Sequence, residues 1–432
     1  MHRLPSEEVL PFLVMVATLL LTGRLMGELF RKLKMPQVMG ELVAGILLGP
    51  SCLEHVAPDV YNSLFATHEK AGIAYDGLGR IGILLLLFVA GMEINLKTIQ
   101  KKANAAAAIS LSGVAFPFLV GFIASWFLSG YLWPNGVEDK FASSLFMGTA
   151  LSITALSVLA KILIDIDKIK SKFGNLMMTA AMIDDFIGWM LFSLVVSVAN
   201  LESESSFEGW QVMFMVLGFA TFILTAGRRA IHWSFTFSNR YLSRGGGTLS
   251  VAIVFCIFGA VFTEWIGLHA IFGAFMVGIA VGDSEHFSHR NREMLHDIVT
   301  YIFAPLFFIS IGFRVDFIEN FDGGVIAFVL LIAVLGKMIG GFIGGRLGKF
   351  STNESIAIGF GMNARGSQEI VLGLIALNAG LITDQIFVAL VIMTFVTIMI
   401  AGPSIRYFLS RHQDDEDEED EQERIQSAGK AD

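Results

Sequence analysis

Long apolar segments separated by short polar stretches run along almost the whole chain. Most of them are about 20 residues long, the length that crosses the hydrocarbon core of a bilayer as an α-helix. The pattern predicts thirteen such helices, and the segments at 36–52 and 267–283 are shorter than the others. The predicted segments are 9–30, 36–52, 79–96, 104–130, 141–164, 173–200, 208–227, 248–265, 267–283, 297–313, 323–345, 354–380 and 383–409. The expected fold class is therefore an all-α polytopic membrane protein.

Composition agrees with this interpretation. Of the 432 residues, 54% are hydrophobic and only 16% are charged, whereas a soluble domain carries about 25% charged residues. Much of the net charge of −9 comes from the acidic run 414–421. That run has no apolar residue to bury, so we expect 411–432 to be a disordered cytoplasmic tail. Two cysteines, Cys52 and Cys256, are too few and too far apart to predict a disulfide framework or a metal site.

The charges of the loops predict the orientation in the membrane. Loops after odd-numbered segments are rich in lysine and arginine, as in Arg31-Lys32 and Arg228-Arg229, whereas loops after even-numbered segments hold few basic residues and several acidic ones. Cytoplasmic loops are the positively charged ones. We therefore expect the N-terminus outside and the C-terminus in the cytoplasm. The first apolar run lacks a basic leader and a small-residue cleavage site, so no cleavable signal peptide is expected.

Two pairs of segments share glycine patterns. The second segment contains Gly40, Gly45 and Gly49, and the ninth contains glycines at 273, 278 and 282 with the same spacing. The third segment ends with the sequence of residues 91–96, GMEINL, and the tenth ends similarly with residues 312–317, GFRVDF. Matching segments are seven apart, so they enter the membrane from opposite sides. This indicates an inverted-topology repeat of segments 2–6 and 9–13, although glycines in membrane helices also serve close packing alone.

The repeat makes the fifth segment correspond to the twelfth. Residues 148–157 of the fifth are rich in glycine and hydroxyl groups, and residues 359–367 of the twelfth contain three glycines with Asn363 and Arg365. We expect both helices to be interrupted at mid-membrane, because unwound backbone is tolerated at that depth where it lines a cavity in the protein. The alternative is two continuous helices whose serine and threonine side chains bond to their own carbonyls.

Adjacent carboxylates make the sixth segment unusual. Asp184 and Asp185 are the only charges between Lys172 and Glu202, and each costs about 2.5–3.5 kcal/mol on insertion scales. Lys337 is the single charge of segment 323–345, and it must find an anion or lose its proton. We predict that Lys337 pairs with one of the aspartates. A purely structural ion pair is the alternative, and it would leave the second carboxylate in need of a mobile partner.

Further polar side chains could complete an ion site. Arg365 and Glu369 are spaced i, i+4 and are predicted to clamp the interrupted helix, with direct ion contact by Glu369 as the minor alternative. Oxygens of Ser152, Thr154 and Asn363 could bind a hard monovalent cation together with the aspartates. Because burial favours the protonated carboxyl group, a proton would compete for this site. The expected activity is exchange driven by an ion gradient, with no cofactor, no nucleic-acid partner and no enzymatic reaction.

At this point the residues resemble a known family. Residues 35–50 (MPQVMGELVAGILLGP), residues 86–93 (LLFVAGME), the Asp184-Asp185 pair, Lys337 and residues 363–366 (NARG) are similar to the monovalent cation:proton antiporter-2 superfamily, which includes bacterial Na⁺/H⁺ and K⁺/H⁺ exchangers. The similarity covers about 1–410. It implies about thirteen helices with two crossed discontinuous ones, elevator-like alternating access and a homodimer in the bacterial plasma membrane, surrounded by lipid.

Specific roles also follow from the resemblance. It implies core helices at about 104–200 and 323–409, dimer-interface helices at about 9–96 and 248–313, and a linker helix at about 208–227. It further implies that Asp185 carries the exchanged cation or proton and that Asp184 pairs with Lys337. The transported Na⁺ or K⁺ would contact Asp185, Asp184 and Thr154. An Asp-Asp pair with this lysine is associated with electrogenic exchange.

Some alternatives stay open. Many relatives have Thr-Asp on the first interrupted helix, whereas this chain has Thr154-Ala155, as in potassium-efflux-like members. Na⁺/H⁺ exchange is the favoured prediction and K⁺/H⁺ exchange the alternative. Those members also carry a cytosolic nucleotide-binding domain, for which this sequence leaves no room, so gating by such a domain is not expected. A cation channel and a membrane sensor of ions or pH are alternatives of another class, and Lys337 argues against the channel.

Overall fold

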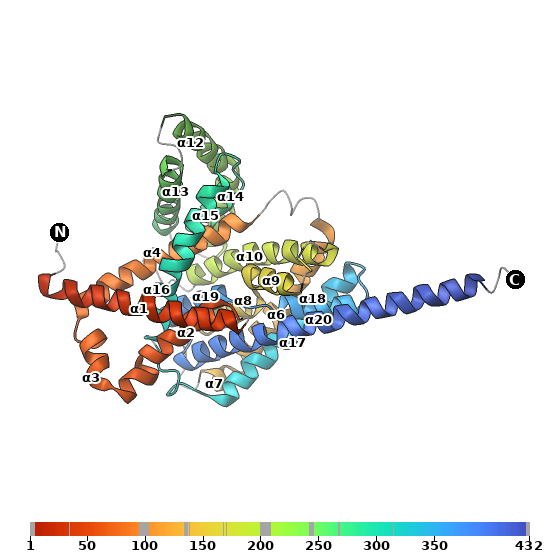
Figure 1. Ribbon diagram of the computed structural model, residues 1–432, viewed down its shortest axis with the longest axis horizontal. Coiled ribbons are helices and arrows are strands. Elements are labelled where there is room, and N and C mark those ends of the chain that lie inside the picture. Colours follow the sequence, from red (N-terminus) through yellow and green to blue (C-terminus); the bar gives the residue numbers. More distant parts are fainter. Residues whose placement is uncertain are drawn as a thin grey trace. The chain divides into compact units, whose positions relative to one another are not determined.

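The computed structural model describes residues 5–33, 35–94, 103–133, 137, 139–166, 168–169, 171–198, 209–241, 246–266, 268–313 and 315–428. Within these ranges every regular element is a helix (Figure 1), which confirms the predicted fold class. The last residues of two predicted segments, 95–96 and 199–200, lie outside the described residues, as does Arg314 in the repeated motif.

Each predicted segment coincides with one or more helices. The α-helices of the first half are α1 (Ser6–Lys32), α2 (Gln37–Leu48), α3 (Pro58–Tyr61), α4 (Glu69–Glu93), α6 (Ala103–Phe127), α7 (Ser129–Leu132), α8 (Lys140–Ser152), α9 (Leu156–Asp165) and α10 (Lys172–Val198). Those of the second half are α11 (Gly209–Phe222), α12 (Arg228–Tyr241), α13 (Gly246–Trp265), α14 (Ala270–Gly282), α15 (His289–Ile298), α16 (Ala304–Gly312), α17 (Gly323–Leu347), α18 (Thr352–Met362), α19 (Ser367–Asn378) and α20 (Asp384–Ala428). Four five-residue π-helical segments also occur: η1 (Pro50–Glu54), η2 (Asn62–Ala66), η3 (Ile223–Gly227) and η4 (Val299–Phe303).

Ten helical stretches of the described residues are long and apolar enough to cross a membrane. The predicted number of thirteen is not confirmed by this measure. The three predicted segments outside the ten are 36–52, 267–283 and 354–380. These three segments form shorter helices. The α-helix of the first ends at Leu48, where η1 follows, and α14 in the second is 13 residues long. The third is interrupted between α18 and α19.

The chain folds into two compact units. The first comprises Met1–Leu96, Trp189–Gly323 and Leu374–Val388, and the second comprises Lys97–Gly188, Gly324–Gly373 and Ala389–Asp432. Residues 189–198 and 374–388, which belong to the predicted core helices, fall in the first unit. The predicted linker 208–227 also falls in the first unit. The assignment of core and dimer-interface roles stays a prediction.

Helix packing in the first unit repeats the glycine spacing of the sequence. α2 packs on α16, and α14 packs on α4. A Cβ at Gly45 would collide with the carbonyl of Ile309, and one at Gly278 would collide with the carbonyl of Phe88. Ile309 and Phe88 each lie three residues before the glycine of the repeated motif. The two helix pairs therefore pack through corresponding residues, as an inverted repeat requires.

The preceding helices extend this correspondence. A Cβ at Gly40 of α2 would collide with the carbonyl of Met26 in α1, and one at Gly273 of α14 would collide with the carbonyl of Gly259 in α13. α1 and α13 are the first and eighth predicted segments, again seven apart. Small residues allow backbones to approach this closely in membrane proteins. The inverted repeat thus accounts for Gly40 and Gly45 of α2 and for Gly273 and Gly278 of α14.

The C-terminal helix differs from the predicted tail. α20 runs from Asp384 to Ala428 and continues through the acidic run 414–421, where the sequence predicts disorder (Figure 1). Glutamate and glutamine are good helix formers, and extension of an existing helix needs no new nucleus. Residues 429–432 of the predicted tail lie outside the described residues.

Candidate ion-binding site

Two interrupted helices lie at the centre of the second unit. α8 ends at Ser152 and α9 begins at Leu156, so Ile153, Thr154 and Ala155 form the first interruption. α18 ends at Met362 and α19 begins at Ser367, so residues 363–366 form the second. The structure confirms the predicted interruptions and excludes two continuous helices at these positions.

The two interruptions are bonded to each other through the backbone. The Ala155 amide donates to the Ala364 carbonyl at 2.7 Å. The Thr154 hydroxyl lies 2.8 Å from the Met362 carbonyl and also 2.8 Å from Oδ2 of Asp184, so its single proton is shared between these two acceptors. Buried helix ends must find partners outside the helix for their free amides and carbonyls. Here each interrupted helix supplies partners to the other, which fixes the point where they cross.

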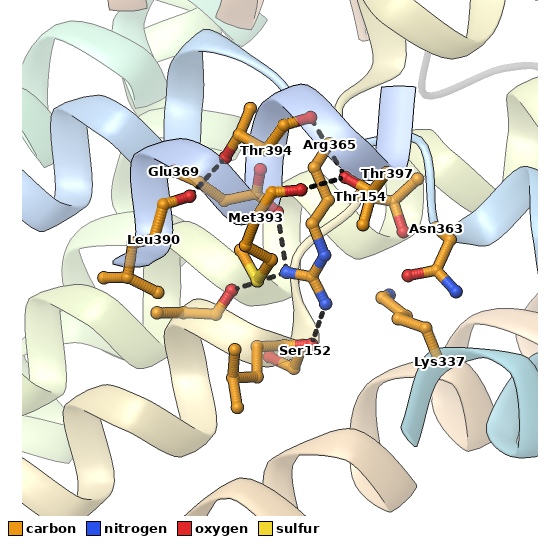
Figure 2. Close-up of polar contacts among 12 residues, drawn as sticks. Ser152, Thr154, Lys337, Asn363, Arg365, Glu369, Leu390, Met393, Thr394 and Thr397 are labelled. Carbon is orange, nitrogen blue, oxygen red and sulfur yellow. Dashed lines mark hydrogen bonds and ion pairs between the residues drawn. The ribbon is translucent and has the colours of Figure 1, made fainter. Parts of the chain in front are cut away.

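Arg365 completes this crossing. Its guanidinium donates to the carbonyls of Ala150 at 3.0 Å and Leu151 at 2.7 Å, in the last turn of α8 (Figure 2). It also forms an ion pair with Glu369 at 2.9 Å. The second oxygen of Glu369 accepts the amide of Gly366 at 2.9 Å and so caps the start of α19. Arg365 and Glu369 thus hold α8 and α19 together, as the predicted clamp does.

Asp184 lies on α10 and is fully bonded by donors from three other helices or interruptions. Its Oδ1 accepts from the Ser110 hydroxyl of α6 at 2.5 Å. Its Oδ2 accepts from Thr154 at 2.8 Å and from the Lys337 ammonium, also at 2.8 Å. All four side chains are completely buried. A buried carboxylate needs such donors to stay ionised, so Asp184 has the surroundings of a fixed anion.

Glycines of α17 bring Lys337 to this depth. A Cβ at Gly340 would approach the Ser112 carbonyl of α6 to 2.6 Å, and one at Gly341 would approach the Gly359 Cα of α18 to 2.8 Å. α17 therefore packs closely on both helices around Lys337. Figure 2 shows the side chains of Lys337 and Asn363 pointing toward one another. The single lysine of this helix is thus placed against Asp184, the partner that the resemblance indicates.

Asp185 has different surroundings, although it is the next residue and is only 1% exposed. The Gln368 carboxamide of α19 donates to its Oδ2 at 3.1 Å. Lys337 is paired with Asp184 at 2.8 Å, and Arg365 is paired with Glu369 at 2.9 Å. The lysine of α17 is therefore held by Asp184, which makes Asp185 the candidate carboxylate for a mobile positive charge.

The remaining predicted site residues are only partly brought together. Asn363 donates through Nδ2 to the Val334 carbonyl at 3.0 Å, and its buried Oδ1 has no hydrogen-bond partner among the described residues. Ser152 donates to the Thr149 carbonyl of its own helix at 2.8 Å. The structure thus gives Ser152 an intrahelical role, and Asn363 offers a free oxygen near Lys337.

Two contacts escaped the sequence analysis. Ser110 bonds to Asp184, and Gln368 bonds to Asp185. Ser110 is one of several small polar residues in an apolar helix, and nothing in its spacing distinguishes it. Gln368 lies beside Glu369, whose charge drew attention first. A neutral side chain in the first turn of α19 gives no energetic signal in the sequence that would distinguish it.

The comparisons with known proteins agree with this geometry. The family model for the transmembrane sodium/hydrogen exchanger matches residues 16–411. The chain belongs to this family. It is therefore a multi-pass membrane transporter of the cation/proton antiporter class, which confirms the family identified from the sequence. The sodium/hydrogen exchanger family transports ions and is not a family of catalytic enzymes.

Similar members of the family come from several organisms. The chain is 30% identical to the Na⁺/H⁺ antiporter NhaS4 of Synechocystis over 93% of this chain and 97% of that protein. It is 30% identical to the Na⁺/H⁺-K⁺ antiporter GerN of Bacillus cereus over 92% of this chain and 96% of GerN. Cation/H⁺ antiporter 17 of Arabidopsis thaliana is 31% identical over 93% of this chain. The chain spans about half of that plant protein, 49% of its length.

A solved structure shows the same fold. The sodium proton antiporter MjNhaP1 of Methanocaldococcus jannaschii aligns with a TM-score of 0.63 at 15% identity, over 93% of this chain and 98% of MjNhaP1. At this identity the likeness concerns the fold alone.

Proposed function

We propose that this sodium/hydrogen exchanger moves Na⁺ and H⁺ in opposite directions and that Asp185 binds them alternately. The observation that carries the proposal is the unequal bonding of the two aspartates. Asp184 accepts hydrogen bonds from Ser110, Thr154 and Lys337, whereas the carboxylate of Asp185 meets a neutral amide. A carboxylate held by a buried ammonium cannot easily exchange its counter-charge, so the proposal assigns the exchanged ion to Asp185 rather than to Asp184.

Lys337 also bears on charge movement. With Asp184 neutralised by the ammonium, the mobile charge at the site is that of Asp185 and its bound ion. If Lys337 releases a proton when a cation binds, more protons than cations move in each cycle and the exchange is electrogenic. While Lys337 is protonated, its ammonium beside the pathway would oppose free cation flow, which favours a carrier over a channel.

The second unit would move as the transporting part. We infer an elevator-like motion in which the interrupted helices, held together by Arg365, carry the ion as one body. The first unit would form the dimer interface of a homodimer in the plasma membrane, with lipid around it. The charges of the loops support an external N-terminus and a cytoplasmic C-terminus. Oligomeric state, motion and orientation are proposals of the same account.

K⁺/H⁺ exchange is the second candidate. Thr154-Ala155 in the first interruption is the sequence observation that favours it. One relative, GerN, is named a Na⁺/H⁺-K⁺ antiporter. A relative from Saccharomyces cerevisiae, named K⁺/H⁺ antiporter 1, is 28% identical over 93% of this chain and 47% of its own length. Both substrates share the chemistry of a hard monovalent cation bound by oxygen ligands.

Transport by the purified protein in proteoliposomes tests these proposals. Internal pH is followed while Na⁺, Li⁺ or K⁺ is added outside, with the membrane voltage set independently. We expect an inward gradient of Na⁺ to drive protons outward, at a rate that changes with voltage. Cation flux under voltage without any proton movement would contradict exchange and indicate a channel, and a rate independent of voltage would contradict electrogenic exchange.

A further inference from the structure

Gln368 has a bonding pattern that the antiport activity alone does not explain. Its Nε2 donates to Oδ2 of Asp185 at 3.1 Å, and its side chain is 9% exposed. Its Oε1 is buried and has no hydrogen-bond partner among the described residues. Buried polar atoms are nearly always bonded. An acceptor left open beside a carboxylate indicates a position that another group completes.

The chemistry of a carboxamide suits a site that alternates between two occupants. One end of the group donates hydrogen bonds and the other accepts them, and the two ends have nearly the same shape. In the present orientation the NH₂ group faces an ionised carboxylate. After a half-turn about the last side-chain bond, Oε1 would face Asp185. Two oxygens would then point at the same space, which is the donor set that a hard cation prefers.

The backbone below Gln368 is held in place, so this turn needs only side-chain torsion. The next residue, Glu369, accepts from the Arg365 guanidinium and from the Gly366 amide, which fixes the first turn of α19. The Lys337 ammonium beside Asp184 can only donate. The Gln368 carboxamide beside Asp185 can donate through one end and accept through the other.

We propose that Gln368 is a specificity-determining ligand of the transported cation, whose carboxamide oxygen binds the ion together with Asp185. In the ion-free state the same side chain donates to the carboxylate, and with the carboxyl group protonated its oxygen accepts the new O–H. This inference rests on the proposed function of Asp185 as the carrier. It adds a second side-chain ligand and the residue that sets preference among monovalent cations.

Preference should follow from the kind of oxygen that Gln368 supplies. A carboxamide oxygen is neutral and carries less charge than a carboxylate, so it contributes to binding without adding a second fixed anion. Without the Gln368 oxygen, the cation is bound by Asp185 together with weaker oxygen ligands or water. The cost of that loss depends on ion size and hydration, so it should differ among Li⁺, Na⁺ and K⁺.

The test replaces Gln368 with methionine, which keeps the length of the side chain and removes both polar ends. In proteoliposomes we expect Gln368→Met to raise the half-saturating Na⁺ concentration about tenfold, as for the loss of one polar contact to a charge. The maximal rate should change much less, and the ranking of Li⁺, Na⁺ and K⁺ should change. Na⁺ should also raise the melting temperature of the variant less than that of the wild type.

Gln37→Met is the matched control. Gln37 likewise donates through Nε2 to a buried carboxylate, Glu41, at 2.8 Å, but on α2 of the first unit. The Gln37→Met variant should have the same half-saturating cation concentrations as the wild type and the same ranking of Li⁺, Na⁺ and K⁺. If Gln368→Met does not fold, Gln368→Asn serves instead, because it withdraws the same amide by one methylene and should act in the same direction.

The outcomes separate this inference from the proposed function. Wild-type half-saturation and ranking in Gln368→Met, with Asp185→Asn inactive, would overturn the role of Gln368 and leave Asp185 as the carrier. Exchange that persists in Asp185→Asn would overturn the proposed function itself. The rate of exchange in Gln368→Met could instead fall equally for all three cations, while Na⁺ raises the melting temperature as much as in the wild type. Gln368 would then be only structural, which also contradicts the inference.

Discussion

The buried pair of Asp184 and Lys337 is the main electrostatic feature at the scale of single residues. Both side chains are fully buried, and their charged atoms lie 2.8 Å apart. Two charges at this depth are tolerated because each neutralises the other, while Ser110 and Thr154 satisfy further acceptor positions of the carboxylate. Removing one partner leaves the other charge uncompensated, so the effect on stability should be large.

Lys337→Ala should therefore lower the stability of the folded protein by about 3–5 kcal/mol, the cost typical of breaking a buried ion pair. The measurement is the melting temperature in detergent. Arg80→Ala is the control, because Arg80 pairs with Asp76 at 2.8 Å on an exposed surface, with 80% of its side chain accessible. Exposed ion pairs contribute little to the free energy of unfolding, so the Arg80→Ala control should have a melting temperature close to that of the wild type. Equal melting temperatures for both variants would argue against the pair as a stabilising element.

The residues of the site differ in how far the sequence predicts them. Lys337 and the aspartates stand out because charges are rare in their apolar segments. A charge buried in such a segment needs a partner of opposite charge. Ser152 was expected at the site on the basis of composition, but its hydroxyl bonds to its own helix. Gln368 was missed because a neutral side chain gives no energetic signal in sequence. Charge scarcity thus predicts which residues must pair, whereas neutral ligands require the actual orientation of each helix face.

Crossed interrupted helices are the defining elements of the second unit. Glycine and hydroxyl content predicts that both helices are interrupted, and the structure confirms it. The sequence does not predict that Arg365 bonds to the carbonyls of Ala150 and Leu151, because this contact depends on how α18 and α19 meet α8. The i, i+4 spacing of Arg365 and Glu369 predicted only the pair along one helix.

Arg365→Lys should weaken this crossing. A guanidinium presents several donors in a fixed planar group, whereas an ammonium acts as a point charge and cannot reach two carbonyls and a carboxylate in the same geometry. We expect a lower melting temperature and at least about tenfold slower exchange, for a loss of one or more buried charged hydrogen bonds. The rate of cation-driven proton movement in vesicles is the readout.

Arg346→Lys provides the comparison for that variant. Arg346 also donates to a backbone carbonyl, that of Phe350 at 2.8 Å, but at an exposed position at the end of α17. This variant should exchange and melt like the wild type. Wild-type behaviour of Arg365→Lys as well would show that the guanidinium does not hold the two interruptions together.

At the scale of the whole molecule, one unit contains the helices that pack through repeated glycines, and the other contains the aspartate pair and Lys337. The hydrophobic pattern predicts nearly every helix, and the glycine spacing predicts the inverted repeat, because both depend on local sequence. The boundaries between the two units depend on long-range contacts, and residues 189–198 and 374–388 of the predicted core helices fall in the first unit. The continuation of α20 to Ala428 also depends on the helix that precedes it.

The central claim is that Asp185 binds the exchanged ion, and one variant tests it most directly. Asp185→Asn keeps the size of the side chain and can still bond to Gln368, so the protein should fold and melt close to the wild type. Exposed Asp76→Asn is the control for loss of one acidic group. In proteoliposomes with a preset pH gradient, Na⁺, Li⁺ and K⁺ are added in turn and proton movement is recorded.

We predict cation-driven proton movement in the wild type and in Asp76→Asn, and only background movement in Asp185→Asn with every cation. Robust exchange by folded Asp185→Asn would contradict the central claim, because the exchanged ion would then bind without the carboxylate of Asp185.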